Sequence, residues 1–222
     1  MAIPIIAPYP MPTEAEVPLA EVSWIPDPAR AVLLIHDMQR YFMNAFTPGL
    51  SPATELVGNI KRLREAADAL GMPVMYTAQP GNMTREQRGL LHDFWGPGMN
   101  TAPEDREIIE ELTPAAGDTV LTKWRYSAFY RTGLRELLAD RGRDQLIICG
   151  VYAHVGCLMT ACDSFTADVQ PFFVADALAD FSRAEHLMAI GYAARRCGIA
   201  DTTGRLLGLL WQRQALTAAR SG

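Results

Sequence analysis

Long hydrophobic runs and paired cysteines are both missing from this sequence. Its longest uninterrupted aliphatic stretch, residues 31–35, is far shorter than the roughly 20 residues that cross a bilayer. The first twelve residues carry neither the basic segment nor the small-residue cleavage site of a secretory signal. None of the four cysteines forms a Cys-x-x-Cys pair, so a disulfide scaffold is excluded and reduced thiols are expected. We therefore expect a cytoplasmic protein without a membrane segment.

Metal-ligand spacings, nucleotide-binding loops and clustered positive charge are missing as well. The four histidines lie far apart and none forms a helical His-x-x-x-His, so we expect no metal site. The formal net charge is −5 with lysines and arginines scattered, which argues against nucleic-acid partners and anionic membranes. No Gly-x-Gly-x-x-Gly follows the first predicted strand, and residues 36–39 contain no glycine, which disfavours a dinucleotide site.

The composition is that of one globular domain with a large core. The chain has 222 residues, of which 49% are hydrophobic and 20% charged, so one folded domain is expected. Seven prolines within residues 1–28 predict an extended N-terminal arm laid over that domain. We place the domain at residues 29–205 and a C-terminal tail at residues 206–222.

Short apolar runs alternate with amphipathic segments from residue 30 onward. Ser51 and Pro52 are expected to begin a helix whose apolar positions recur at helical spacing until Gly71 ends it. Strands are predicted at residues 31–35, 73–77, 119–122, 146–149 and 171–174, with a weaker one at 199–202. Further helices are predicted near residues 104–112, 132–141, 156–167 and 183–197. The alternation predicts an α/β fold, a three-layer αβα sandwich with a mostly parallel, Rossmann-like sheet.

Polar residues follow the carboxyl ends of these strands, where a parallel sheet binds its ligand. They are His36 and Asp37, residues 77–79, residues 123–125, residues 150–154 and Asp176. Taken singly, a strand-terminal Asp usually caps the next turn and a strand-terminal Lys is usually solvated. An acid, an amide, a base and a glycine-rich turn on one rim of the sheet together favour a functional site.

Six ordered motifs within residues 1–203 resemble the isochorismatase family, and six in the same order argue against chance. They are His36-Asp37-Met38-Gln39, Tyr76-Thr77-Ala78-Gln79-Pro80, Trp95-Gly96-Pro97-Gly98, Lys123-Trp124-Arg125-Tyr126-Ser127-Ala128-Phe129, Gly150-Val151-Tyr152-Ala153-His154-Val155-Gly156 and Val174-Ala175-Asp176-Ala177. The resemblance is to siderophore-pathway isochorismatases and their phenazine-pathway relatives. It implies a hydrolase of a small anionic, chorismate-derived substrate that needs no cofactor.

The sequence departs from the wider superfamily at one catalytic position. That superfamily, which includes nicotinamidases, uses an Asp, a Lys and a nucleophilic Cys, and the resemblance carries the first two to Asp37 and Lys123. Gly156 stands where the Cys would be, and Cys157 falls one residue later. One residue turns a helical side chain by about 100°, so we expect Cys157 to point away from the site and pack in the core.

Hydrolysis of a vinyl ether, which the resemblance implies, needs an acid rather than a nucleophile. Protonating the terminal methylene carbon creates an oxocarbenium ion that water attacks, and we assign Asp37 as that acid. Lys123 is expected to pair with Asp37 in the free enzyme and with a carboxylate of bound substrate. The predicted substrate-binding residues are Gln79, Arg88 and Tyr152 for oxygens, the Gly156 amide for a carboxylate, and Phe42, Trp95 and Tyr126 as an apolar wall. The family also implies a cis peptide bond between Val151 and Tyr152.

Two substrates fit this chemistry. Isochorismate would give 2,3-dihydro-2,3-dihydroxybenzoate and pyruvate, and 2-amino-2-deoxyisochorismate would give trans-2,3-dihydro-3-hydroxyanthranilate and pyruvate. Residues 39–42 and 93–99 resemble the phenazine enzymes, whereas residues 1–4, 156–157 and 175–182 resemble the siderophore enzymes, and we favour isochorismate slightly. A Cys amidohydrolase and a non-catalytic binding protein are less favoured alternatives. The resemblance implies a homodimer, and the residues after Thr203 are too few for an aryl carrier domain, so none is expected.

Overall fold

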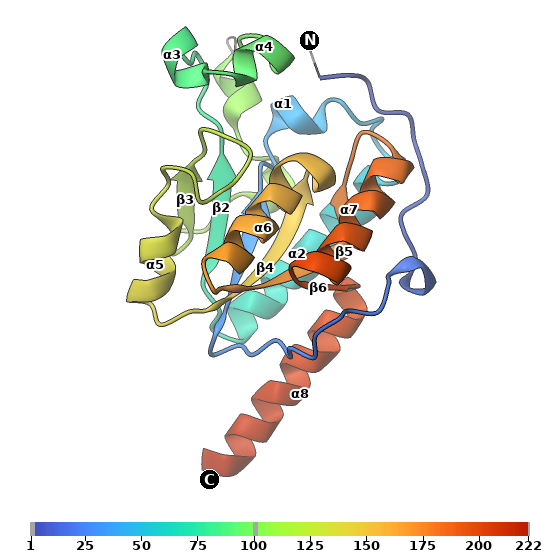
Figure 1. Ribbon diagram of the computed structural model, residues 1–222, viewed down its shortest axis with the longest axis vertical. Coiled ribbons are helices and arrows are strands. Elements are labelled where there is room, and N and C mark those ends of the chain that lie inside the picture. The colour runs from blue at the N-terminus through green and yellow to red at the C-terminus, as the bar shows by residue number, and fades with distance from the viewer. Residues whose placement is uncertain (1–2, 100–101, 222) are drawn as a thin grey trace.

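Six parallel strands form the central sheet of the computed structural model, which describes residues 3–99 and 102–221 (Figure 1). The strand order across the sheet is β3-β2-β1-β4-β5-β6, so β1 and β4 lie side by side in the middle. The strands are β1 (Ala31–His36), β2 (Val74–Ala78), β3 (Thr119–Thr122), β4 (Gln145–Val151), β5 (Gln170–Ala179) and β6 (Ile199–Asp201). Every expected strand is present, and each neighbouring pair is parallel.

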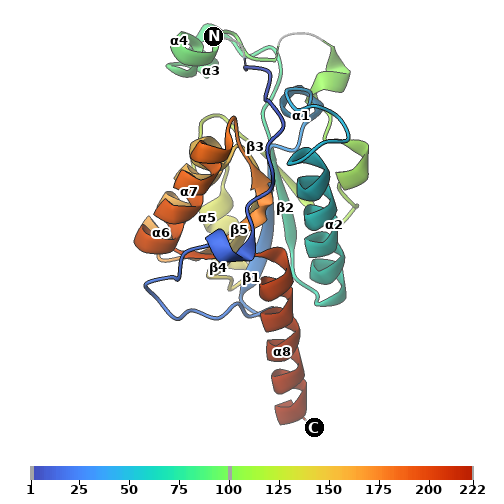
Figure 2. The ribbon, with the colours of Figure 1, turned by 90° about the vertical axis from the view of Figure 1, so that its right-hand side faces the viewer.

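Helices cover both faces of the sheet (Figure 2). On one face lie α5 (Leu134–Asp140), α6 (Leu158–Thr166) and α7 (Arg183–Arg196), and on the other lie α2 (Ala53–Ala69) and α8 (Thr203–Ser221). All residues of β1 and of β4 are buried, because a strand covered on both faces is apolar along its whole length rather than at alternate positions. The three-layer α/β fold expected from the sequence is confirmed.

The helix α2 follows its sequence pattern closely except at its first turn. Its buried face carries apolar side chains at helical spacing, namely Leu56, Ile60, Leu63 and Ala67. The expected cap is wrong, since the helix begins at Ala53 and the Ser51 hydroxyl accepts a hydrogen bond from the Met11 amide at 3.1 Å. A contact with the N-terminal arm has taken the place of the local cap.

The helix expected at residues 104–112 is not formed. Two short 3₁₀ turns, Pro103–Arg106 and Glu110–Leu112, flank an extended segment instead. Ile108 forms an antiparallel bridge with Gln39, and the Ile109 amide donates to the Met38 carbonyl at 3.0 Å. Hydrogen bonds to the chain that follows β1 thus override the helical pattern of this segment.

Several short helices were not predicted, and they lie beyond the carboxyl ends of the strands (Figure 1). They are α1 (Arg40–Met43), α3 (Arg85–Arg88) and α4 (Leu91–Trp95). The helix expected at residues 156–167 begins earlier, with a π-helical turn at Ala153–Cys157, and continues as α6. These elements surround the end of the sheet where the motif residues gather.

The proline-rich N-terminal arm runs along the side of the domain (Figure 2). Ile6 is buried and bridges to Phe46, and the buried Tyr9 hydroxyl accepts a hydrogen bond from the Asp180 amide at 2.8 Å. A 3₁₀ turn, Glu14–Glu16, interrupts the extended chain. Met1 and Ala2 of the expected arm lie outside the described residues.

The expected C-terminal tail is largely the helix α8, and the expected boundary at residue 205 falls inside it. Leu206 and Leu210 are buried in the core beside α2, whereas residues 211–219 are exposed. The far half of the helix projects away from the domain (Figure 1). Gly222 lies outside the described residues. Over the described residues, no helix has the length and hydropathy that a membrane span requires.

Candidate active site

A pocket opens where the strand order of the sheet reverses. The chain runs from β1 outward to β2 and β3, then returns to place β4 on the other side of β1. Ligands of open parallel sheets bind at such a point, beyond the carboxyl ends of the strands. The pocket encloses about 530 Å³, including its open mouth. All nine predicted site residues line it: Asp37, Phe42, Gln79, Arg88, Trp95, Lys123, Tyr126, Tyr152 and Gly156.

Asp37 and Lys123 form a buried ion pair in this pocket. Asp37 directly follows β1 and Lys123 directly follows β3, so the parallel sheet brings both to one rim. The Lys123 ammonium donates to Asp37 Oδ2 at 2.7 Å, and the two side chains are 2% and 5% exposed. At so low an exposure the two charges depend on each other for the solvation that water would otherwise provide.

Two neighbours on β2 and its extension complete the hydrogen bonding of the Asp37 carboxylate. The Thr77 hydroxyl donates to Oδ1 at 2.6 Å, and the Gln79 amide donates to Oδ2 at 3.3 Å. Asp37 itself has a φ of +52°, in the left-handed region that Asp tolerates better than most residues. This conformation turns the chain sharply at the end of β1, where the carboxylate meets its three donors.

The electrostatic surroundings keep Asp37 ionised. Burial opposes the charged form, but the Lys123 ammonium, His36 and the hydrogen bonds from Lys123 and Thr77 together lower the pKa of Asp37 below its usual value. The neighbouring His36 is fully buried, and burial is the main cause that lowers its pKa to about 4. In the free protein near neutral pH, the site therefore holds one carboxylate, one ammonium and a neutral imidazole.

Arg88 brings a second positive charge to the pocket. Its guanidinium donates to the Gln79 side-chain oxygen and to the Gly96 carbonyl, both at 3.1 Å. Among the described residues, the partners of Arg88 are neutral groups and the neighbouring Arg125, and none of them is a carboxylate. Gly98 packs against it so closely, with φ +78°, that an added Cβ would lie 2.8 Å from the guanidinium carbon. A buried guanidinium bonded only to neutral groups can still bind an anion.

Aromatic side chains form much of the pocket wall. The Trp95 indole donates to the Tyr126 hydroxyl at 2.8 Å, and the Tyr152 hydroxyl donates to the Phe42 carbonyl at 2.8 Å. The rings of Tyr152 and Phe181 lie 4.3 Å apart between centroids. The polar groups of Trp95, Tyr126 and Tyr152 are thus bonded to one another or to the backbone. The aromatic rings can exclude bulk water from a bound ligand.

The turn after β4 brings main chain rather than a reactive side chain to the pocket. The Val151–Tyr152 peptide bond is cis, and Gly156 lies in the π-helical turn that follows. Cys157 is fully buried in the core cluster on the α6 side of the sheet, and burial raises the pKa of its thiol well above the usual value. It is not among the lining residues of the pocket. A buried, protonated thiol is a poor nucleophile.

The pocket is also lined by residues that were not predicted as site residues: Ile3, Tyr41, Leu91, Val151, Val155 and Phe181. Tyr41 and Val155 are sequence neighbours of predicted residues. Phe181 was not placed at the site, because the predicted fifth strand ends at residue 174 whereas β5 continues to Ala179. Asp176, a candidate from its strand-end position, instead accepts hydrogen bonds from the Thr203 amide and hydroxyl at the start of α8.

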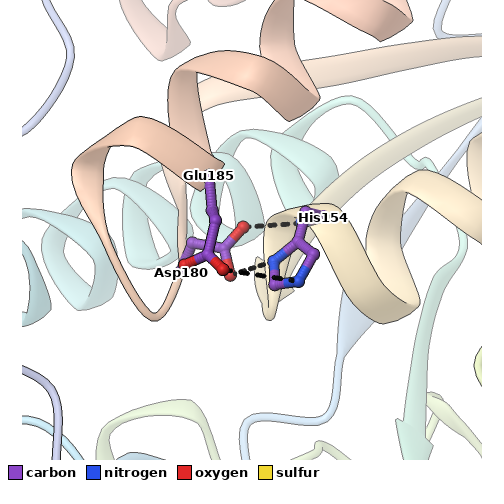
Figure 3. A group of neighbouring side chains, drawn as sticks. All are labelled: His154, Asp180 and Glu185. Carbon is purple, nitrogen blue, oxygen red and sulfur yellow. Dashed lines mark hydrogen bonds and ion pairs between the residues drawn. The ribbon is translucent and has the colours of Figure 1, made fainter.

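His154, Asp180 and Glu185 form a cluster (Figure 3). It adjoins the pocket through Phe181, whose ring lies 5.5 Å from that of His154 between centroids. Asp180 accepts from the His154 amide at 2.6 Å, from His154 Nδ1 at 2.7 Å and from the Phe181 amide at 2.9 Å. Glu185 faces the other ring nitrogen at 3.9 Å. One possible ligand atom from each of the three residues lies within 4.8 Å of the other two, close enough to face one cation. The two carboxylates, however, contact different nitrogens of the His154 ring, Asp180 at Nδ1 and Glu185 at Nε2. The contacts form a hydrogen-bonded clamp, the Asp180–His154 clamp, between two walls of the pocket.

Comparison with known proteins matches the whole domain. The family model described as "Isochorismatase domain" matches residues 31–204. The chain is 56% identical to "Isochorismatase" of Bacillus subtilis over 100% of this chain and 72% of that protein. It is 54% identical to "Phenazine biosynthesis protein PhzD" of Pseudomonas fluorescens over 92% of this chain and 98% of that protein.

A solved structure shows the same fold at lower sequence identity. A cysteine hydrolase from Pseudomonas syringae superimposes with a TM-score of 0.79 and 24% identity, covering 88% of this chain and 98% of that one. At this identity the likeness concerns the fold alone.

Proposed function

Because this chain belongs to the isochorismatase family of hydrolases, we propose that it cleaves the vinyl ether of isochorismate into 2,3-dihydro-2,3-dihydroxybenzoate and pyruvate. One observation carries the proposal: the buried Asp37–Lys123 pair faces an aromatic-walled pocket in which Gly156 supplies no nucleophile. The relative that is 56% identical is named an isochorismatase, which supports the same assignment.

Asp37 is the proposed general acid. In its protonated form it delivers the proton to the terminal methylene carbon of the enolpyruvyl group. The C=C electron pair forms the new C–H bond, and the Asp37 carboxylate is left. The oxocarbenium ion that results is attacked by water. The hemiketal then collapses, the C–O bond to the ring breaks, and pyruvate and the ring diol leave. This sequence is a hydrolysis, so it is balanced by one water molecule.

The charges of the pocket suit a substrate with two carboxylates. Among the described residues that line it, Lys123 and Arg88 are cationic and Asp37 is the single carboxylate. We propose that Lys123 binds the carboxylate of the enolpyruvyl group, and that Arg88 and the Gly156 amide are available to the other carboxylate. Gln79 and Tyr152 would contact substrate oxygens, and Phe42, Trp95 and Tyr126 would enclose the ring.

The alternative substrate is 2-amino-2-deoxyisochorismate, with an ammonium in place of one ring hydroxyl. The 54% identity to a phenazine biosynthesis protein supports it. The pocket lining argues the other way, because the described lining residues offer no carboxylate other than Asp37 to receive an ammonium. We therefore favour isochorismate, and comparing pyruvate release from the two purified substrates decides between them.

The first prediction tests the acid itself. Asp37→Asn should lower kcat for pyruvate release by about a thousandfold, because an amide of nearly the same shape has no acidic proton to give. Binding of substrate should persist, since an anionic ligand no longer meets a carboxylate. Asp176→Asn is the matched control, because Asp176 lies within β5 and its Oδ1 accepts from the Thr203 amide and hydroxyl at the start of α8, which an Asn oxygen can also do. An Asp37→Asn enzyme with a tenth of wild-type kcat would contradict the assignment.

We also propose that the protein acts as a homodimer. Large apolar side chains stand exposed on the N-terminal arm and on α8: Ile5, Leu19, Ile25, Trp211 and Leu216. Apolar groups collected on an extended arm and a projecting helix are typical of surfaces that pair with a second copy. Sedimentation at micromolar concentration should give a particle of twice the 24.4 kDa chain mass, and a monomer there would exclude the dimer.

A further inference from the structure

Gly156 has no room for a side chain. A Cβ built on it would lie 2.3 Å from His36 Cε1, 3.0 Å from Nε2 and 3.2 Å from Nδ1. The three nearest atoms thus all belong to one imidazole ring. Gly156 itself lines the pocket, whereas His36 is completely buried beneath it.

The His36 ring is fully buried and is anchored at one nitrogen. Its Nδ1 donates to the Val151 carbonyl oxygen at 2.9 Å, and its Nε2 lies 3.3 Å from the Thr160 hydroxyl oxygen. The Thr160 hydroxyl donates its proton to the Gly156 carbonyl at 2.8 Å, so Thr160 lies against both the ring and the glycine. The backbone of His36 is fixed as well, because it pairs with Gly150 of β4 in the sheet. The two chains lie so close that a Cβ built on Gly150 would be 2.2 Å from the His36 carbonyl oxygen.

We infer that His36 is the specificity-determining residue that keeps position 156 bare. Any residue with a Cβ at position 156 would collide with a buried ring that Nδ1 anchors to the Val151 carbonyl, so His36 prevents this π-helical turn from presenting a thiol, a hydroxyl or a carboxylate to substrate. The pocket is thereby reserved for a substrate whose cleavage needs an acid and not an enzyme nucleophile. The claim about substrate choice rests on the proposed function. The steric claim, that His36 excludes a side chain at position 156, can be tested without any substrate.

A double-mutant cycle between positions 36 and 156 tests the steric claim. Gly156→Ala in the presence of His36 should lower Tm by more than about 5 °C, because the added methyl meets a fixed ring. In a His36→Ala background the same substitution should lower Tm by less than about 2 °C, because the colliding atoms are gone. Gly58→Ala in α2 is the matched control, since a Cβ there meets nothing within 4 Å, and it should leave Tm unchanged or raise it.

An equal loss of Tm on Gly156→Ala in both backgrounds would overturn the inference. If His36→Ala does not yield folded protein, His36→Val gives the same comparison, because valine lacks the ring atoms that collide. A coupling near zero with either partner then excludes His36 as the residue that determines position 156.

A chemical readout tests whether the pocket can be opened to nucleophilic chemistry. The double variant His36→Ala, Gly156→Cys should fold and react with iodoacetamide, in which the thiolate forms an S–C bond and iodide leaves. Peptide mapping should place the label at residue 156. Wild type and Cys157→Ala should both remain unlabelled at the pocket, and Cys157→Ala should keep most of its activity, because Cys157 is a buried core residue.

The two proposals fail in different ways. If wild type releases no pyruvate from either ether but the Tm cycle shows strong coupling, the proposed function fails and the role of His36 stands. If Gly156→Cys with His36 intact is as stable and as readily alkylated as the double variant, the role of His36 fails. Vinyl ether hydrolysis by Asp37 would be unaffected by that second result.

Discussion

Asp37 is held ionised in the free enzyme by the same contacts that would position it for catalysis. The Lys123 ammonium at 2.7 Å and the Thr77 hydroxyl at 2.6 Å stabilise the carboxylate, and together with His36 they lower its pKa. A general acid, however, must carry a proton when its substrate is bound. The proposed substrate would resolve this conflict, because its carboxylates would compete for Lys123 and bring negative charge close to Asp37, and both effects raise a carboxyl pKa.

The second prediction therefore concerns proton uptake on binding. Near pH 7 a non-hydrolysable ether analogue should take up a proton as it binds, since Asp37 is ionised in the free enzyme and protonated in the complex. Calorimetric titrations in buffers of different ionisation enthalpy measure this uptake, and Asp37→Asn should abolish it. For the reaction itself, kcat should fall with rising pH, with an apparent pKa above the roughly 3.9 of an unperturbed Asp. Absence of uptake in wild type would mean that Asp37 acquires its proton by another route.

The sequence could locate the proposed catalytic and binding residues because they directly follow strands that are short and strongly apolar. Asp37, Gln79 and Lys123 each lie within two residues of a predicted strand end, and parallel strands bring such ends together. The residue that leaves no room for a side chain at position 156 could not be predicted in this way. His36 contacts it across 120 positions of sequence, and only the packing of β1 against the π-helical turn creates that contact.

The Asp180–His154 clamp joins two elements that shape the pocket. One is the π-helical turn Ala153–Cys157, in which the His154 amide donates to the Asp180 carboxylate, and the other is the segment that carries Phe181. Burial disfavours a charged imidazole, but the hydrogen bond and the charges of Asp180 and Glu185 outweigh it and raise the pKa of His154 above its usual value. A charged His154 therefore tightens the clamp.

The third prediction follows from the sign of that shift. A group whose pKa is raised on folding contributes stability below its unfolded pKa of about 6.5 and loses it as pH rises through the folded value. Relative to His154→Gln, wild type should be more stable by about 1 kcal/mol in mild acid, and the difference should shrink above neutral pH. Urea unfolding of both proteins across this range measures it. A difference that does not vary with pH would exclude a charged clamp.

Element boundaries were predictable where local pattern and tertiary packing agree. In α2 the apolar spacing coincides with the buried face, and the expected helix is formed. At residues 104–112 the local pattern favoured a helix, but the Gln39 side chain donates to the Arg106 carbonyl at 2.7 Å and the main chain pairs with the segment after β1. Hydrogen bonds between segments some 70 positions apart leave no trace in local periodicity, so sequence reasoning could not find them.

The helix α8 shows a similar limit at the edge of the domain. Its first turns bury Leu206 and Leu210 against the core, and the Arg213 guanidinium donates to Asp27 at 2.8 Å, which ties the helix to the N-terminal arm. The N-terminal arm and the first turns of α8 are thus attached to the domain through contacts distant in sequence. The alternation of strands and helices was predictable from the apolar runs of the sequence. These attachments depend on the completed fold and were not.

The last prediction concerns the stability of the whole molecule in acid, which two buried neutral histidines should dominate. Burial lowers the pKa of both His36 and His186 to about 4. A histidine whose pKa is depressed on folding contributes stability above its unfolded pKa of about 6.5 and loses it as pH falls towards the folded value. Between pH 6.5 and pH 4 each should therefore reduce the free energy of unfolding by about 3 kcal/mol, against which the raised pKa of His154 acts in the opposite direction.

His186→Gln separates the two contributions, because glutamine can keep both hydrogen bonds. His186 Nε2 lies 2.9 Å from the Ala175 carbonyl oxygen, to which it donates, so Nδ1 accepts from the Tyr9 hydroxyl at 3.2 Å. A glutamine amide can donate and accept in the same way but does not titrate. The variant should thus lose about half as much stability as wild type between pH 6.5 and pH 4, measured by urea unfolding at each pH. An unchanged pH dependence would show that His186 is not held neutral in the folded protein, and the remaining slope would then have to arise from His36 and the carboxylates.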